Sequence, residues 1–193
     1  MAPVILGLAL AALALGDVAA TPPRPTWPWG GTLTLKTCGT GERIEESSST
    51  YARLAPKVIA GLATGLGCLE ANPSTPKRAE GLRKWLDQNT DHVLFFLCTD
   101  EEMNSSRDAN ACGASRAVFG GALIQFHLFV ENPSRCGCVE ATVYHELLHV
   151  TSSGKAECPP YRCAKSCFEC AVPVPRYPGG GEDCDRVPSC CDP

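Results

Sequence analysis

The sequence lacks the features that mark nucleic-acid-binding and membrane-spanning proteins. It has no cluster of Lys and Arg, and its formal net charge at pH 7 is -4. A protein that neutralises phosphate groups needs a basic patch, so nucleic acid and anionic lipid are excluded as partners. After the first 20 residues no apolar run has the roughly 20 residues that a membrane span requires. No internal repeat is present.

Residues 1–20 predict a secretory signal peptide. A nearly uninterrupted apolar run extends from Val4 to Leu15, and the small residues Ala19 and Ala20 precede a proline-rich segment. Because the run is shorter than a membrane span, we expect cleavage after Ala20 rather than retention as an anchor. The mature protein is therefore expected to be soluble and secreted, either extracellular or periplasmic.

The remainder of the chain has the length of one domain. We expect residues 21–48, which begin with a run rich in Pro, Trp and Gly, to form an extended N-terminal segment. Residues 49–170 are expected to form the folded domain, and residues 171–193 a cysteine-rich tail.

Thirteen cysteines in an exported chain of 193 residues predict a disulfide framework. Nine of them follow Arg135, which predicts a loop-rich segment held by cross-links rather than by a core. Because thirteen is odd, at least one cysteine is free, pairs with another chain or binds a ligand. Cys136 with Cys138, and Cys167 with Cys170, also have spacings compatible with a structural zinc. An oxidising compartment favours disulfides instead.

Hydrophobic periodicity predicts an α+β domain. Apolar residues at helical spacing predict one helix over 49–66, closed by Gly67, and a proline at the first helical position predicts a second over 75–89. The apolar run 92–98 predicts a buried strand, and a Gly-Gly pair within 116–130 predicts a hairpin. These elements together predict a small, mostly antiparallel sheet.

A further helix is predicted from Val139 to Val150, where apolar residues at helical spacing form one stripe. His145 and His149 lie roughly opposite that stripe. The helix is therefore expected to pack by one side and to present both imidazoles on another.

The sequence HELLH at residues 145–149 is the candidate catalytic motif. H-E-x-x-H on a helix places two imidazoles one turn apart, close enough to bind a single Zn²⁺. A catalytic zinc takes three protein ligands and keeps one position open. Glu146 is placed to act as the general base, taking a proton from the water that attacks a peptide carbonyl. The alternative is a solvated helix face on which His and Glu only form an ion pair.

The third ligand must come from outside the motif. Metzincin zinc peptidases have glycine and then histidine at the third and sixth positions after HExxH, where this chain has Ser152 and Lys155, so that class is excluded. His92 and His127 lie upstream in predicted strands and are less favoured. Glu157, which follows a glycine turn, is the preferred ligand.

Residues 115–161 resemble the aspzincins, the deuterolysin group of zinc endopeptidases. Their pattern is HExxH, then Gly-Thr-x-x-Asp, then a nearby tyrosine. Gly154 matches the glycine and Tyr161 resembles the tyrosine, while Glu157 replaces the aspartate one position early and Lys155 replaces the threonine. The resemblance implies a zincin-like fold and endoproteolysis, with Zn²⁺ held by His145, His149 and Glu157.

The resemblance also implies roles around the metal. Substrate in zincins lies extended along the edge strand of the sheet, for which 123–130 is the candidate. Tyr161, and with less support Tyr144, is a candidate hydrogen-bond donor to the oxyanion of the tetrahedral intermediate.

The sequence thus predicts a secreted zinc metalloendopeptidase that acts on peptide or protein substrates as a monomer, without a nucleic-acid partner or a membrane span. Two alternatives remain open. One is a non-catalytic, cysteine-rich binding or surface module on a zincin-like scaffold. The other is a structural secreted protein in which HELLH is an accidental helix face.

Overall fold

The computed structural model describes residues 33–38, 40–72, 76–88, 94–98, 112–118, 121–127, 133–152 and 158–170. Several sequence predictions lie outside the described residues, namely the signal peptide (1–20), His92, Glu157, the tail (171–193) and the side chain of His127.

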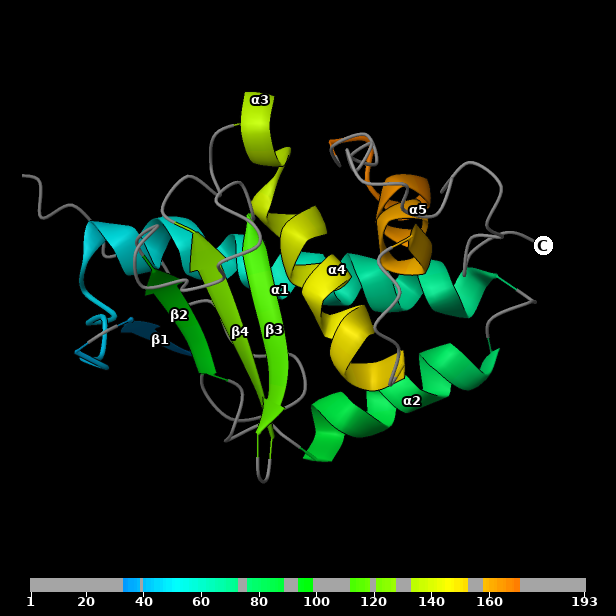
Figure 1. Ribbon diagram of the computed structural model, residues 1–193, viewed down its shortest axis with the longest axis horizontal. Coiled ribbons are helices and arrows are strands. Elements are labelled where there is room, and N and C mark those ends of the chain that lie inside the picture. The colour runs from blue at the N-terminus through cyan, green and yellow to red at the C-terminus, as the bar shows by residue number, and fades with distance from the viewer. Residues whose placement is uncertain are drawn as a thin grey trace, which may run out of the picture.

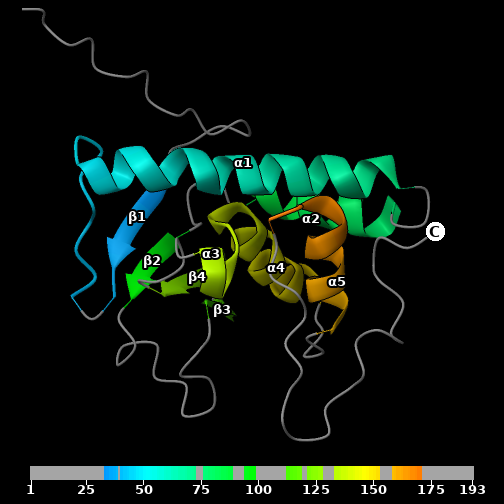
Figure 2. The ribbon, with the colours of Figure 1, turned by 90° about the horizontal axis from the view of Figure 1, so that it is seen from above.

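Four strands form one sheet, and the helices pack around it and beside it (Figure 1). In chain order the elements are β1 (Thr34–Thr37), α1 (Ser49–Ala71), α2 (Pro76–Gln88), β2 (Leu94–Cys98), β3 (Gly113–Val118), β4 (Gly121–His127), α3 (Pro133–Cys136), α4 (Val139–Ser152) and α5 (Cys158–Cys167). The long helix α1 runs along one side of the molecule, and the sheet, α4 and α5 lie on the other side of it (Figure 2). The predicted helices, the strand within 92–98 and the hairpin are confirmed.

The sheet is mixed, with the strand order β1-β2-β4-β3. β1 and β2 are parallel, β2 and β4 are parallel, and only β3 and β4 are antiparallel. The predicted mostly antiparallel sheet is therefore wrong. Two helices connect β1 to β2, and such a crossover returns the chain to the end of the sheet where it started, which makes the strands parallel. β1, only four residues long, is too short to show a period in the sequence.

The edge strand also differs from the prediction. β4 lies between β2 and β3, whereas β1 and β3 form the two edges; β3 is the edge strand next to β4. The expectation that 123–130 would be the edge strand is wrong. β4 is the more apolar strand of the hairpin, which suits a central position in the sheet.

Helix α1 contributes one side of the hydrophobic core. The Ser48 hydroxyl caps it by accepting a hydrogen bond from the Tyr51 amide at 3.1 Å. Gly67, predicted to close the helix, lies inside it, and the helix continues to Ala71. Among the described residues only α1 is long and apolar enough to cross a membrane, and nine of its residues are buried against the rest of the domain. Packing in the core accounts for its composition.

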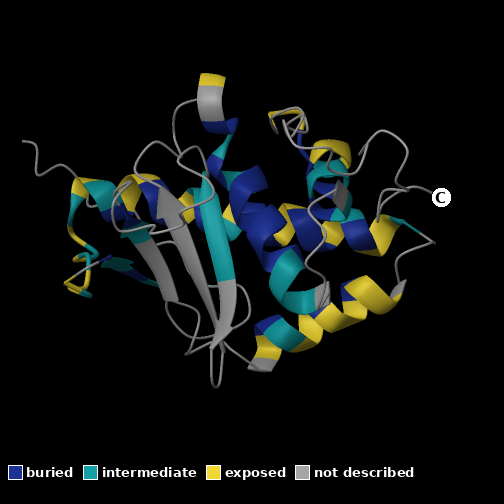
Figure 3. Cartoon of the chain, in the orientation of Figure 1, coloured by how far each residue is buried: buried dark blue, intermediate teal, exposed yellow. Residues whose placement is uncertain are grey.

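Two glycines bring α1 and α4 into close contact. A Cβ atom on Gly61 would collide with the backbone of Glu140, and one on Gly65 would collide with the ring of Tyr144. Glu140 and Tyr144 are one turn apart on α4, as Gly61 and Gly65 are on α1. The missing side chains therefore let α4 settle directly onto α1, and α4 is buried over most of its length (Figure 3).

The segment after the motif contains a helix where loops were expected. In α5, Cys163 and Ala164 are buried in the same core as α1 and α4, and so is Phe168 just beyond the helix. The prediction of a loop-rich segment held by cross-links rather than by a core is wrong for residues 158–170. Pro159 and Pro160 do not break the helix because they lie in its first turn, where backbone amides have no partner within the helix.

Disulfides join distant elements, as the cysteine content predicted. The four pairs between described residues are Cys38–Cys98, Cys68–Cys167, Cys112–Cys136 and Cys138–Cys170. Cys163 is disulfide-bonded as well. The members of each closely spaced pair bond to different partners, so these cysteines act as cross-links and not as ligands of a structural zinc.

Candidate functional site

The site is built on α4, which begins after the turn Cys136-Gly137-Cys138. Gly137 has φ +68°, a left-handed conformation that favours glycine. The Cys138 carbonyl accepts two hydrogen bonds from Thr142, one from its amide and one from its hydroxyl, both at 3.2 Å. Cystine bonds from Cys136 and Cys138 flank the turn. The start of α4 is therefore fixed in both direction and position.

The two motif histidines converge on one point. Their Nε2 atoms are 3.1 Å apart, with ring centroids 4.8 Å apart and planes at 77°. His145 is buried, and His149 is half-buried. Two nitrogens bound to the same tetrahedral zinc at 2.0–2.1 Å lie about 3.3–3.4 Å apart. The pair is thus within a few tenths of an ångström (roughly) of the separation that the ion requires, so these residues fit a zinc site.

Glu146 points toward the edge strand. It is 6% exposed, and a Cβ atom added to Gly113 would lie 3.0 Å from both its Cγ and its Oε1. The same added atom would lie 3.0 Å from Cγ2 of Thr142. The carboxylate of the predicted general base therefore rests against the first residue of β3.

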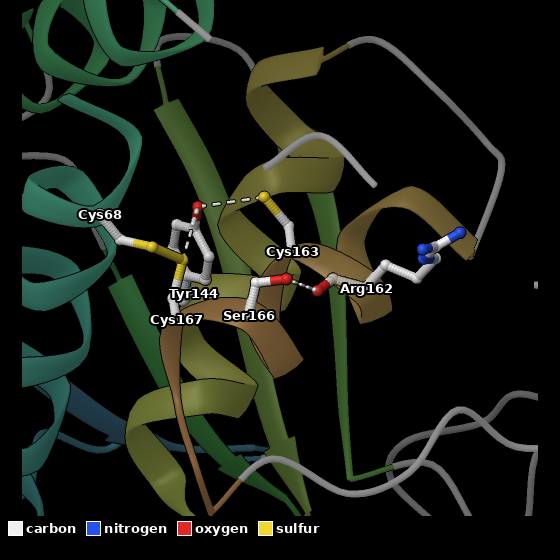
Figure 4. The surroundings of a disulfide bond; sticks show 6 residues. All are labelled: Cys68, Tyr144, Arg162, Cys163, Ser166 and Cys167. Atoms are coloured by element: carbon white, nitrogen blue, oxygen red, sulfur yellow. Dashed lines mark hydrogen bonds between the residues drawn. A yellow bond between two sulfur atoms is a disulfide. The ribbon is translucent and has the colours of Figure 1, made fainter. Parts of the chain in front are cut away.

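Tyr161 reaches the site from α5. Its ring centroid is 4.2 Å from that of His145, with the two planes tilted by 52°. The Cys68–Cys167 disulfide ties α5 to α1 (Figure 4). The structure thus brings together His145, His149 and Tyr161, and the packing of α5 on α4 is what places Tyr161 beside the motif.

Tyr144, the second candidate donor, is a core residue. It is fully buried, and its hydroxyl lies 3.4 Å from Sγ of Cys163 and 4.0 Å from Sγ of Cys167 (Figure 4). Both sulfurs are in disulfides, so the hydroxyl is the donor. Burial raises the pKa of Tyr144 well above its usual range, and Arg78 opposes this only in part. The hydroxyl contacts cysteines of α5 and not the histidines, so Tyr144 is not retained as a candidate oxyanion donor.

Within the described parts of the chain, no three His, Cys, Asp or Glu side chains form a group that could hold a metal. His145 and His149 are the described part of the predicted ligand set. Glu157, the preferred third ligand, lies outside the described residues.

The proximity of β3 to the motif was not predictable from the sequence. Gly113 and Ser115 lie on the same face of the strand, because alternate residues share a face, and Gly113 faces α4. The Ser115 hydroxyl oxygen is buried and has no hydrogen-bond partner among the described residues. The available signal was a glycine directly after a cysteine, three residues before the predicted hairpin.

Comparison with known proteins gives no relative. No family model matches the chain, and neither a curated protein nor a solved structure is similar to it. The functional assignment therefore depends on the residues of the site.

Proposed function

We propose that this protein is a secreted zinc endopeptidase that hydrolyses peptide bonds with Glu146 as the general base. The observation that carries the proposal is the 3.1 Å separation of the Nε2 atoms of His145 and His149. It supports a shared metal ion, because the two nitrogens lie close to the separation that one tetrahedral zinc requires. Without a metal, the same separation is that of a hydrogen bond between the two imidazoles.

His145, His149 and Glu157 would hold the zinc. Glu157 directly precedes Cys158, the first residue of α5, and Tyr161 one turn later contacts His145. Chain connectivity therefore supports Glu157 as the third ligand. A zincin-like fold related to the aspzincins is part of the same proposal, supported by the HELLH helix beside a sheet whose edge strand is β3.

The residues of the chain have distinct roles in this reaction. Bound zinc supplies Lewis acidity, which polarises a peptide carbonyl and makes water a stronger nucleophile near neutral pH. Glu146 takes the proton from the attacking water and later gives it to the leaving amine. The Tyr161 hydroxyl donates a hydrogen bond to the oxyanion that develops on the former carbonyl.

Strand β3 offers a binding surface for the substrate. As an edge strand it has backbone N–H and C=O groups along one side that no described strand pairs with. An extended peptide can add to such an edge as a further strand. The contact between Gly113 and Glu146 then places the bound backbone beside the general base. Disulfides between distant elements suit a protein that works outside the cell.

Substitutions at Glu146 and Glu157 test the proposal, because they should have different effects on zinc affinity and on the rate of hydrolysis. Glu146→Gln keeps size but cannot accept the proton, so zinc stays bound while hydrolysis of an unfolded protein falls by about 10²- to 10⁴-fold. Glu157→Gln replaces an anionic ligand by a neutral amide and lowers zinc affinity as well as rate.

The matched control is Glu140→Gln, the same change in the first turn of the same helix, which should leave zinc content and rate unaltered. Undiminished zinc affinity in Glu157→Gln would place the third ligand elsewhere. Zinc binding by the parent protein without any hydrolysis would instead favour a non-catalytic module on the same scaffold.

A further inference from the structure

The first residue of the edge strand is a glycine for reasons of space. Among the described glycines, left-handed φ values occur only at Gly41 and Gly137, so Gly113 is not required for its backbone conformation. A methyl group at position 113 would instead meet Glu146 and Thr142, each at 3.0 Å. Such contacts are tighter than most contacts of real Cβ atoms, so a neighbour must shift by a few tenths of an ångström.

The side chain of Glu146 is the neighbour that can shift most easily. The contact at Gly61 is different. A methyl group there would meet the backbone of Glu140, which cannot yield unless the helix shifts. At position 113 the methyl would meet Cγ and Oε1 of Glu146, a side chain with several rotatable bonds, and Cγ2 of Thr142. An added methyl there is therefore expected to displace the carboxylate while the fold persists.

A disulfide holds the strand in this position. Cys112, the residue before Gly113, is bonded to Cys136, which is 1% exposed and lies two residues before the Cys138 carbonyl that receives the Thr142 hydrogen bonds. The covalent link thus connects the start of β3 to the start of α4. The link limits how far the start of the strand can move away from Glu146 to relieve a new contact.

We propose that Gly113, fixed by the Cys112–Cys136 disulfide, is a positioning residue that determines where the Glu146 carboxylate lies relative to the bound peptide. This inference rests on the proposed function. The distance between β3 and the Glu146 carboxylate is then set by the absence of a side chain at Gly113 and by the Cys112–Cys136 disulfide.

The test is the steady-state kinetics of Gly113→Ala on a peptide substrate, with zinc content and thermal unfolding measured on the same samples. A misplaced catalytic group costs up to about 10²-fold in rate, so we expect kcat to fall at least about tenfold. KM should stay within about twofold, because the substrate backbone still adds to β3. Zinc content should not change. Gly81→Ala, at an exposed position with open space around it, is the matched control and should keep the parent kcat.

Two further variants keep the test decisive if Gly113→Ala folds poorly. Thr142→Ser removes the Cγ2 methyl but keeps the hydroxyl, so the Gly113→Ala/Thr142→Ser protein has more room and should recover part of the lost kcat. Cys112→Ser/Cys136→Ser frees the strand without adding a methyl group and should also lower kcat with zinc retained.

A parent kcat in every folded variant would overturn the inference. If the parent protein neither binds zinc nor hydrolyses peptides, the proposed function is wrong. If the parent is active and Gly113→Ala is equally active, only the inference about Gly113 is wrong.

Discussion

The ring of Tyr161 lies against the ring of His145, with 4.2 Å between centroids. The two residues come from different helices, and α5 is held to α1 by the Cys68–Cys167 disulfide. An imidazole that must keep one orientation to bind a metal benefits from such a contact, since neighbouring groups fix the ring that ligates the metal. In the proposed reaction Tyr161 makes two separable contributions, one from its ring and one from its hydroxyl.

Substitutions at Tyr161 separate these contributions. Tyr161→Phe keeps the ring and removes the donor, so zinc affinity should be retained while kcat falls by about 10- to 10³-fold, as on loss of an oxyanion donor. Tyr161→Ala removes the ring as well and should also weaken zinc binding. Zinc titration and kinetics of both variants check this. Equal kcat for Tyr161→Phe and the parent would contradict the donor role.

Gly65→Ala should destabilise the fold strongly, because its methyl group would overlap the buried ring of Tyr144. Overpacking a core costs about 1–3 kcal/mol, which urea unfolding can measure. Gly67→Ala is the control, since the space around Gly67 is open and alanine is the better helix former by up to about 1 kcal/mol. A Gly65→Ala protein as stable as Gly67→Ala would show that the α1 and α4 contact is not close.

Stability should decline in alkali because burial raises the pKa of Tyr144 in the folded protein. Above pH about 10, the ordinary tyrosine value, the unfolded chain loses the proton while the folded chain keeps it. The free energy of unfolding therefore falls as the pH rises from there toward the folded pKa. Tyr144→Phe should flatten this fall, at a cost near neutral pH of about 0.5–1.5 kcal/mol for the lost hydrogen bond. An unchanged slope would contradict the assignment.

The denatured but unreduced protein should expose few thiols. Four disulfides and the bonded Cys163 use ten of the thirteen cysteines, so at most three should react with a thiol reagent. More than three reactive thiols would contradict the disulfide framework. Reduction before denaturation should release all thirteen and serves as the control.

Local patterns predicted the elements that carry a strong period. The helix from Val139 and its two histidines follow from spacing alone, because residues four apart share a helix face. Helix α2 was predicted from the proline at its first position. Strand pairing was not predictable in the same way. β1 is short, and its parallel partnership with β2 depends on how two intervening helices pack.

The site shows the same division. HELLH and Tyr161 were identified from residue types and order, whereas Gly113 was not, because its role depends on a contact across more than 30 positions of chain with Glu146. A glycine in a strand carries no chemical signal of its own. The lack of a side chain at Gly113 matters only because Glu146 lies next to it, and that proximity results from the packing of β3 on α4.

The most direct test of the zinc site is the zinc-to-protein ratio of the purified mature protein, measured by elemental analysis beside that of His149→Ala. The convergence of the two Nε2 atoms predicts one zinc per chain in the parent and in a His92→Ala control, and none in His149→Ala. Absence of zinc from the parent, or full zinc content in His149→Ala, would contradict the account.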